Sequence, residues 1–429
     1  MRVASRPAVL LFTFLAAATG CLPSAPAQQT DVPALLAEGR LADAVQSLQQ
    51  ELEQPGASES VLRYRLGVVQ FLQAIEQLGQ AQYRHGLMSS SRLSIPLLRL
   101  PLPPNRDPEQ LTIEKARGFI ADFLQGLKTA EATLAAVKPS GDVLTLDLAS
   151  VCIDLNGDDE IARDESLFAI VNTLMRTGGG GLNEDGMQIA FDDGDVLWLR
   201  GYCHVMCAFC EVVLAYNWDD LFERTAHLFF PSTKTPYVFL LQERAGDAPF
   251  TLQNGLDLIA MIHCLHFEVR DREGLLRALQ HLEQVPQLSR ESWELINAET
   301  DNNREWLPNP RQAAAISQLL RITPEMQSQW NLFLDEMDAI LRGDTLLPFW
   351  RGTPGINPFD ANGASFHPKL GINVRRIFTE PQTFDLVLWI HGSGMASFLE
   401  EGPITKPERW SQITSAFRGQ FMFFAVWFN

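Results

Sequence analysis

The sequence has 429 residues and a formal charge of −18, from 34 Lys and Arg residues against 52 Asp and Glu residues. Hydrophobic residues make up 46% and charged residues 20%, which is typical of a folded globular protein and excludes wholesale disorder. The acid excess argues against nucleic acid or anionic lipid as the main partner, because phosphate binding needs clustered Lys and Arg side chains. The length allows two or three domains or one large helical array.

The N-terminal residues 1–27 are typical of a signal peptide. Arg2 and Arg6 give a positive start, and residues 8–18 form an uncharged, mostly apolar run. This run is too short to span a bilayer, so we interpret it as the h-region of an export signal. No later stretch is expected to be a transmembrane segment. We therefore expect an exported protein, either periplasmic or in the cell envelope.

Two processing sites stay open for this signal. The small-x-small sequence at 25–27, before Gln28, fits ordinary cleavage that releases a soluble protein. Residues 18–21 resemble a lipoprotein box, in which Cys21 would carry a lipid anchor. Ala18 stands where a Leu or Val would strengthen that resemblance, so we favour the soluble form.

Removal of residues 1–27 leaves 32 basic against 52 acidic residues, a charge of −20. An odd and small number of cysteines for this length argues against a disulfide framework. One disulfide between the cluster at 203–210 and Cys264 stays open. The cysteines of the mature chain are Cys152, Cys203, Cys207, Cys210 and Cys264.

Residues 28–95 are predicted to be helical and to begin with a helical hairpin. Gly39 falls at the turn between two helices, Ala44 at the small position where they cross, and Leu48 and Leu52 continue the second helix. This pattern resembles the first hairpin of a tetratricopeptide repeat (TPR). The resemblance fades beyond this region, so a plain helical hairpin stays open as the alternative.

The remaining chain is divided by composition. Five prolines predict an extended connector at 96–108, whose interleaved leucines pack on a surface. Residues 109–343 are predicted to form a helical core, and residues 344–429 to be ordered coil up to 382 followed by docked C-terminal helices. Minor strands are expected near 143–153 and 386–390. The expected core helices are 110–137, 165–176, 195–217, 251–266, 272–285, 290–300, 310–320 and one from Thr323-Pro324 to Gly343. The fold class is therefore mainly α, a multi-helix array with TPR-like N-terminal hairpins.

Residues 154–165 resemble a single EF-hand calcium loop. Ca²⁺ takes several oxygen ligands, and a twelve-residue loop supplies them from positions 1, 3, 5, 7, 9 and 12. The matching residues, in that order but without position 9, are Asp154, Asn156, Asp158, Glu160 through its carbonyl, and Glu165. The resemblance implies one structural Ca²⁺.

The loop departs from the family pattern at three points. Position 6, where the chain turns with positive φ, is Asp159 and not Gly. Position 9 is Ala162, so a water would have to serve there, and the segment before the loop alternates like a strand instead of a helix. Ile161 falls at the position that normally points into the core. The alternative is an acidic turn that caps the helix beginning near Asp164.

Acidic residues are concentrated around this loop. Residues 154–195 contain eleven acids and two arginines. Within them, Asp192, Asp193 and Asp195 form a second acidic turn. We favour an N-cap for the helix that follows over additional ligands for the same ion, because Asp is a favoured N-cap residue.

Two further patterns are weighed as metal sites. Cys203, Cys207 and Cys210 have the spacing of a radical-SAM cluster, but their segment is apolar on nearly every face and predicts a buried helix. A site built from His204, His263, His266 and nearby cysteines would make the protein a metal-dependent envelope enzyme.

We expect a non-catalytic, exported helical protein that holds one Ca²⁺ and binds protein partners through its helical surfaces. The metal-dependent enzyme is the alternative.

Overall fold

The computed structural model describes residues 31–56, 58–88, 98, 100–176, 188–242, 252–315, 321–351, 370–417, 419, 421, 424 and 425. The signal peptide, Cys21 and the two processing sites lie outside the described residues. The chain from Val32 to Asn429 forms one compact unit.

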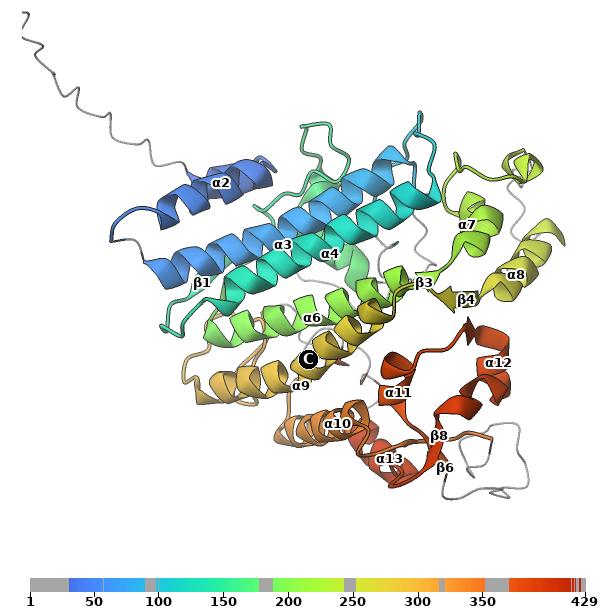
Figure 1. Ribbon diagram of the computed structural model, residues 1–429. Coiled ribbons are helices and arrows are strands. Elements are labelled where there is room, and N and C mark those ends of the chain that lie inside the picture. The colour runs from blue at the N-terminus through green and yellow to red at the C-terminus, as the bar shows by residue number, and fades with distance from the viewer. Residues whose placement is uncertain are drawn as a thin grey trace, which may run out of the picture. The chain divides into compact units, whose positions relative to one another are not determined.

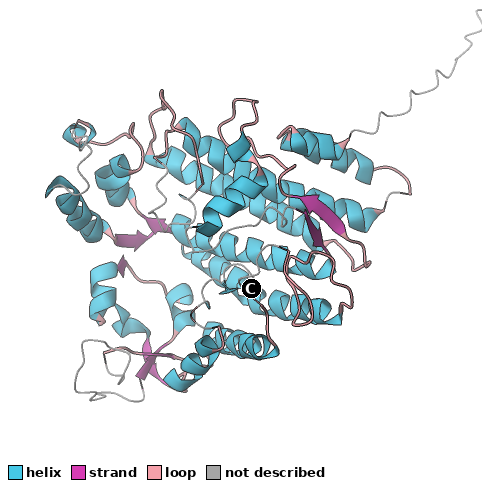
Figure 2. Ribbon diagram, turned by 180° about the vertical axis from the view of Figure 1, so that it is seen from behind, coloured by secondary structure: helices cyan, strands magenta, loops and turns pink. Residues whose placement is uncertain are grey.

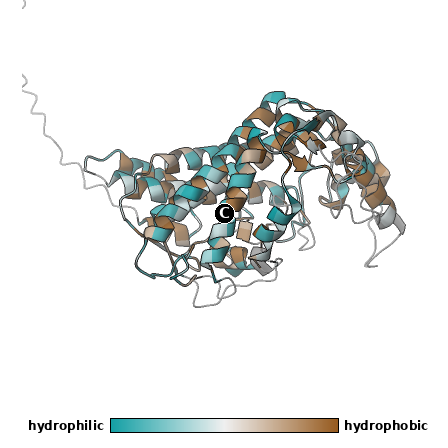
Figure 3. Ribbon diagram, turned by 90° about the horizontal axis from the view of Figure 1, so that it is seen from below, coloured by the Kyte–Doolittle hydropathy of each residue, from teal (hydrophilic) through white to brown (hydrophobic). Residues whose placement is uncertain are grey.

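The fold is mainly α, as predicted, with only short strands (Figures 1 and 2). Hydrophobic and hydrophilic residues alternate around the helices (Figure 3), as expected where each helix buries one face. The α-helices are α1 (Val32–Ala37), α2 (Leu41–Leu52), α3 (Glu59–Arg84), α4 (Ile113–Ala135), α5 (Leu167–Arg176), α6 (Asp193–Ala215), α7 (Asp219–Thr225), α8 (Leu252–Cys264), α9 (Arg272–Ala298), α10 (Pro324–Arg342), α11 (Val374–Thr379), α12 (Leu386–His391) and α13 (Pro407–Ser415). Short 3₁₀ helices are η2 (Arg163–Glu165), η4 (Ala226–Leu228), η5 (Val238–Leu241) and η6 (Ser393–Phe398).

Four long helices, α3, α4, α6 and α9, form the centre of the unit and pack in that order (Figure 1). Their apolar faces supply much of the core. Gly67 of α3 allows close approach to α4, because a Cβ there would lie 2.5 Å from the Leu134 side chain. The N-terminal hairpin α1–α2 packs on α3, and Gly39 makes its turn with φ 67°.

Within the described residues, the short strands form three small antiparallel sheets. They are β1 (Leu144–Asp147) with β2 (Gln188–Phe191); β3 (Tyr216–Asn217), β4 (His266–Val269) and β7 (Phe384–Asp385) in that order; and β5 (Leu347–Pro348), β6 (Leu370–Ile372) and β8 (Leu399–Glu401) in that order. The β1–β2 pair places Leu144 opposite Phe191 and Asp147 opposite Gln188. These sheets tie loops to helices and form no layer of their own.

Several predicted boundaries are confirmed. Helix α10 begins after Thr323, whose hydroxyl accepts the Met326 N–H at 3.1 Å, and ends at Gly343 with φ 79°. The connector leucines Leu100 and Leu102 are buried, and so is Phe424 of the apolar tail. The described part of the connector therefore packs on the protein, and Phe424 is docked in the core.

The prediction of two helices at 272–285 and 290–300 is wrong, because α9 runs through Pro286 without a break. A proline removes one backbone donor and strains the preceding turn. Pro286 and its neighbours Val285 and Leu288 are buried, so tertiary packing stabilises the helix across this position.

The strand expected at 386–390 is also wrong, since this segment is helix α12. The Asp385 side chain accepts the Leu388 N–H at 2.9 Å and starts the helix directly after β7. The coil expected up to 382 contains β5, β6 and α11 within its described part. Residues 310–315 form turns and a bridge instead of a helix, and 316–320 lie outside the described residues.

The length and composition of helix α6 are relevant to the expectation that the chain has no transmembrane segment after the signal peptide. Among the described residues it is the one helix long and apolar enough to cross a membrane by length and composition. Half of its apolar window is buried inside the protein, against α4 and α9. The core helix of a globular protein passes the same test, so this property is weak evidence for a membrane span.

Candidate functional site: the 154–165 loop

The predicted calcium loop is anchored at both ends. Residues 151–155, which lead into it, are buried, and the Cys152 N–H donates to the Leu36 carbonyl of α1 at 2.9 Å. The Ile153 N–H donates to the Glu165 carbonyl at 2.9 Å, and Cys152 forms an antiparallel bridge with Ser166. The loop therefore closes on itself and fastens the α1–α2 hairpin to the helical core.

Inside the loop, the side chains at positions 1, 3 and 5 hold the backbone. Asp154 accepts the Gly157 N–H at 2.7 Å through Oδ1 and the Asp159 N–H at 3.2 Å through Oδ2. Asn156 Oδ1 accepts the Asp158 N–H at 2.8 Å, and Asp158 Oδ1 accepts the Glu160 N–H at 2.9 Å. Asp159 has φ 61°, the left-handed conformation that the pattern requires at position 6.

Glu165, at position 12, folds back onto the loop, where both of its oxygens accept backbone N–H groups. Its side chain is 3% exposed; Oε1 accepts the Leu155 N–H at 3.2 Å and Oε2 the Ala162 N–H at 3.0 Å. Asp154, Asp158 and Glu165 do not form a group whose oxygens all lie within 4.8 Å of one another. Bidentate binding of Ca²⁺ would require Glu165 to exchange these hydrogen bonds for the ion.

The flanks of the loop differ in part from expectation. Ile161 is 36% exposed and contacts Gly39 at the α1–α2 turn, so it does not point into the main core. The helix expected from 165 begins at Leu167, after the 3₁₀ turn η2. No helix enters the loop, as the strand-like pattern predicted.

A buried acid that the sequence analysis missed lies against this loop. Glu76 of α3 is 7% exposed, and its Oε1 has no hydrogen-bond partner within the described part of the chain. Burial, together with the charges of Asp154 and Glu165, raises the pKa of Glu76 to about 8, although the Asp154 backbone stabilises its charged form. Burial likewise raises the pKa of Glu165. Glu76 lies four residues after Leu72 on the buried face of α3. An acid at a helix position that otherwise carries apolar residues was the sequence signal that could have identified it.

The second acidic turn is an N-cap, as favoured. Asp192 Oδ1 accepts the Gly194 N–H at 2.8 Å and the Asp195 N–H at 3.4 Å, and Asp195 Oδ2 accepts the Asp192 N–H at 3.0 Å. Asp192 also approaches two glutamates, Glu299 and Glu305, that lie more than a hundred residues further along the chain. Sequence spacing gave no sign of this grouping.

The histidines do not assemble the alternative metal site. His204 lies 2.8 Å from His281, Nδ1 to Nδ1, and not beside the other two predicted residues. His263 and His266 are exposed, and His266 Nδ1 lies 3.0 Å from an Asp385 oxygen. Together, His204, His263 and His266 do not form a group of metal-ligand spacing.

The cysteines that the structure describes are buried and free. Cys203, Cys207 and Cys210 are at most 1% exposed and share one face of α6, as the buried-helix interpretation predicted. Burial raises the pKa of Cys207 and of Cys210 to about 12, so both thiols stay protonated and unreactive at neutral pH. Cys152 and Cys264 are also free. The disulfide between Cys264 and the 203–210 cluster, which the sequence left as a possibility, does not form in this structure.

No protein-family model, curated protein or solved structure matches this chain.

Proposed function

We propose that this chain is a non-catalytic, exported binding protein of the cell envelope, stabilised by one Ca²⁺ at the 154–165 loop. One observation carries the calcium proposal. Asp154 and Glu165 of the loop are buried beside Glu76, and within the described residues no salt bridge joins any of the three to a basic side chain. Buried carboxylates without a cation are costly, and a hard divalent ion coordinated by oxygen relieves that cost.

The loop's position gives such an ion a structural role. The loop joins α1 through Cys152 and contacts α3, where Gly79 packs on Leu155 and the Gln80 amide donates to the Asp154 carbonyl at 2.9 Å. An ion that rigidifies 154–165 would therefore hold the N-terminal hairpin to the core. A single loop of this kind fits a structural ion better than a paired sensor domain.

The binding role rests on exposed apolar side chains of two helices that contact each other. α8 and α12 pack together, and their outer faces carry large apolar residues that are 41–69% exposed. Contiguous exposed apolar side chains mark interaction surfaces. These residues are Leu256, Leu258, Ile259 and Ile262 of α8 and Val387, Leu388 and Ile390 of α12.

The calcium proposal is tested by thermal unfolding of the mature chain with Ca²⁺ or with a chelator. Wild type should lose several degrees of Tm in chelator, and Asp154→Asn should unfold at the same Tm in both conditions. Asp257→Asn on α8, outside the loop, is the matched control and should keep the calcium response. An equal calcium response in wild type and Asp154→Asn would contradict the proposal.

The binding proposal is tested by crosslinking in cells that export the protein. Ile259→Asp with Ile390→Asp should abolish a specific crosslinked partner without changing Tm, because both side chains are more than 60% exposed. A partner retained by this variant would show that binding uses another surface. Zinc or iron bound stoichiometrically to the purified protein would favour the alternative, a metal-dependent enzyme.

A further inference from the structure

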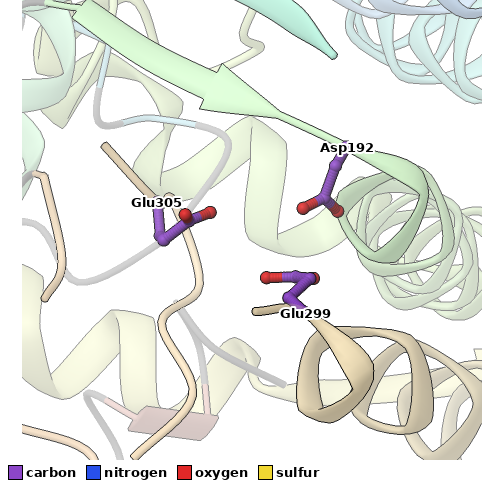
Figure 4. Close-up of side chains that lie close together, drawn as sticks. All are labelled: Asp192, Glu299 and Glu305. Atoms are coloured by element: carbon purple, nitrogen blue, oxygen red, sulfur yellow. The ribbon is translucent and has the colours of Figure 1, made fainter. Parts of the chain in front are cut away.

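Three carboxylates meet at a second place, remote in sequence from one another. Asp192 caps α6, Glu299 directly follows α9, and Glu305 lies in the segment after it. One oxygen from each lies within 4.8 Å of the others, and the side chains point toward a common space (Figure 4). Glu305 is 4% exposed, and Asp192 and Glu299 are partly buried.

The backbone around the three residues is fixed by hydrogen bonds. Glu305 forms parallel bridges with Ala190 of β2 and with Ala314, and its carbonyl accepts the Ala315 N–H at 2.9 Å. Each carboxylate also has one oxygen held by the protein. The donors are the Gly194 N–H for Asp192 at 2.8 Å, the Gln312 side chain for Glu299 at 2.9 Å and the Asn303 N–H for Glu305 at 2.7 Å.

A fourth acid supplies an independent observation. Asp195 is 3% exposed, and while its Oδ2 accepts the Asp192 N–H, its Oδ1 has no hydrogen-bond partner within the described residues. Asp195 is therefore a buried carboxyl group that contacts Asp192 directly and keeps one oxygen unsatisfied.

Between the long helices, two carboxylates are paired with basic side chains. Glu211 is paired with Lys128 and Arg277, and Glu131 with Arg200. Within the described residues, no salt bridge joins a carboxylate of this acidic group to a basic side chain. Arg311 donates to the Glu299 backbone carbonyl at 2.9 Å. Such an acidic group must take up either protons or a cation.

We propose that Asp192, Glu299 and Glu305, with Asp195 beside them, bind a hard divalent cation such as Ca²⁺, Mg²⁺ or Mn²⁺. Carboxylate oxygens are the ligands these ions prefer. The ion joins the N-terminus of α6 to the C-terminus of α9 and to the 299–305 segment. This site is separate from the 154–165 loop and does not depend on it.

The test measures cation stoichiometry on the full mature chain after metal removal, by titration calorimetry with Ca²⁺, Mg²⁺ and Mn²⁺ in turn. The Asp154→Asn variant, whose 154–165 loop is disabled, should still bind one equivalent of at least one of these ions. Adding Glu299→Gln and Glu305→Gln to Asp154→Asn should abolish this binding or lower its affinity at least about tenfold. Adding Glu294→Gln, at an exposed position of α9, should leave the stoichiometry and the affinity unchanged.

Two results would overturn the site. Asp154→Asn protein that binds no divalent cation would show that the acidic group only shares protons. Retention of the equivalent in the Glu299→Gln/Glu305→Gln variant, folded by circular dichroism, would place the ion elsewhere. If the loop proposal alone is wrong, wild type and Asp154→Asn bind the same single equivalent, so the two proposals fail separately.

Discussion

Glu211 connects the three helices at the centre of the fold, and its neutralisation should be strongly destabilising. This carboxylate of α6 is 2% exposed. Its Oε1 lies 2.6 Å from Lys128 Nζ of α4, and the Arg277 guanidinium of α9 reaches both oxygens at 2.9–3.0 Å. Burial alone would raise the pKa of Glu211, but Arg277 and Lys128 outweigh it and lower that pKa. The perturbation is Glu211→Gln, which removes the charge and keeps the shape.

The magnitude follows from what the substitution leaves behind. Removing one partner of a buried ion pair costs about 3–5 kcal/mol, because the other charge stays desolvated. Lys128 and Arg277 are 35% and 44% exposed, so both can partly return to water. We therefore expect a loss of about 2–3 kcal/mol in the free energy of unfolding. Arg277→Gln should cost less, since Lys128 still pairs with the buried carboxylate.

The assay is urea unfolding at neutral pH, in which a lower midpoint at an unchanged m value reports lost stability. Glu59→Gln is the matched control: Glu59 is 68% exposed and pairs with Arg63 on the surface of α3. Such a surface pair contributes at most about 0.5 kcal/mol. If Glu211→Gln lowers stability no more than Glu59→Gln, the three-helix ion pair does not stabilise the fold.

Two further predictions concern the docked tail and the histidine pair. Phe424 is fully buried against Trp293 and Trp330, so Phe424→Ala should lower the free energy of unfolding by about 3–5 kcal/mol in the same urea assay. The control Phe239→Ala, at a 57% exposed position, should change that free energy by less than about 0.5 kcal/mol. Equal losses in the two variants would contradict the docking of Phe424. Burial lowers the pKa of His281 to about 4, so on acidification the unfolded state protonates this histidine before the folded state does. The free energy of unfolding should therefore fall as the pH drops from about 6.5 toward 4. Urea midpoints measured across this pH range should fall less steeply for His281→Gln than for wild type, and an equally steep fall would contradict the lowered pKa of His281.

Local chemistry made some elements predictable. Helix α10 carries its own boundaries, with a Thr cap, Pro at the first position and Gly343 in the left-handed conformation. Gly39 likewise marks the α1–α2 turn, with φ 67°. Such features act within a few residues of sequence, so they can be recognised without knowledge of the packing.

Tertiary packing determined the elements that sequence patterns missed. Pro286 predicts a break, but it is buried within α9, and packing against neighbouring helices keeps the helix continuous at this position. The apolar run 386–390 is compatible with either strand or helix, and the Asp385 cap selects the helix. Glu76 and Glu305 are candidate site residues because of neighbours that are distant in sequence. Hydrophobic periodicity within a single helix or strand cannot predict such contacts.

The acidic concentration at 154–195 separates into two places once the chain is folded. Its first part, with Asp154 and Glu165, packs against α3 and gains Glu76, and its last part, with Asp192, approaches Glu305. Both places join a loop to a long helix, whereas Glu211 and Glu131, which lie between long helices, have basic partners. A side-chain cation is fixed by the helix that carries it, but a free divalent ion can enter at a loop after the helices have packed. The arrangement of the charges therefore favours two separate ions over one shared ion.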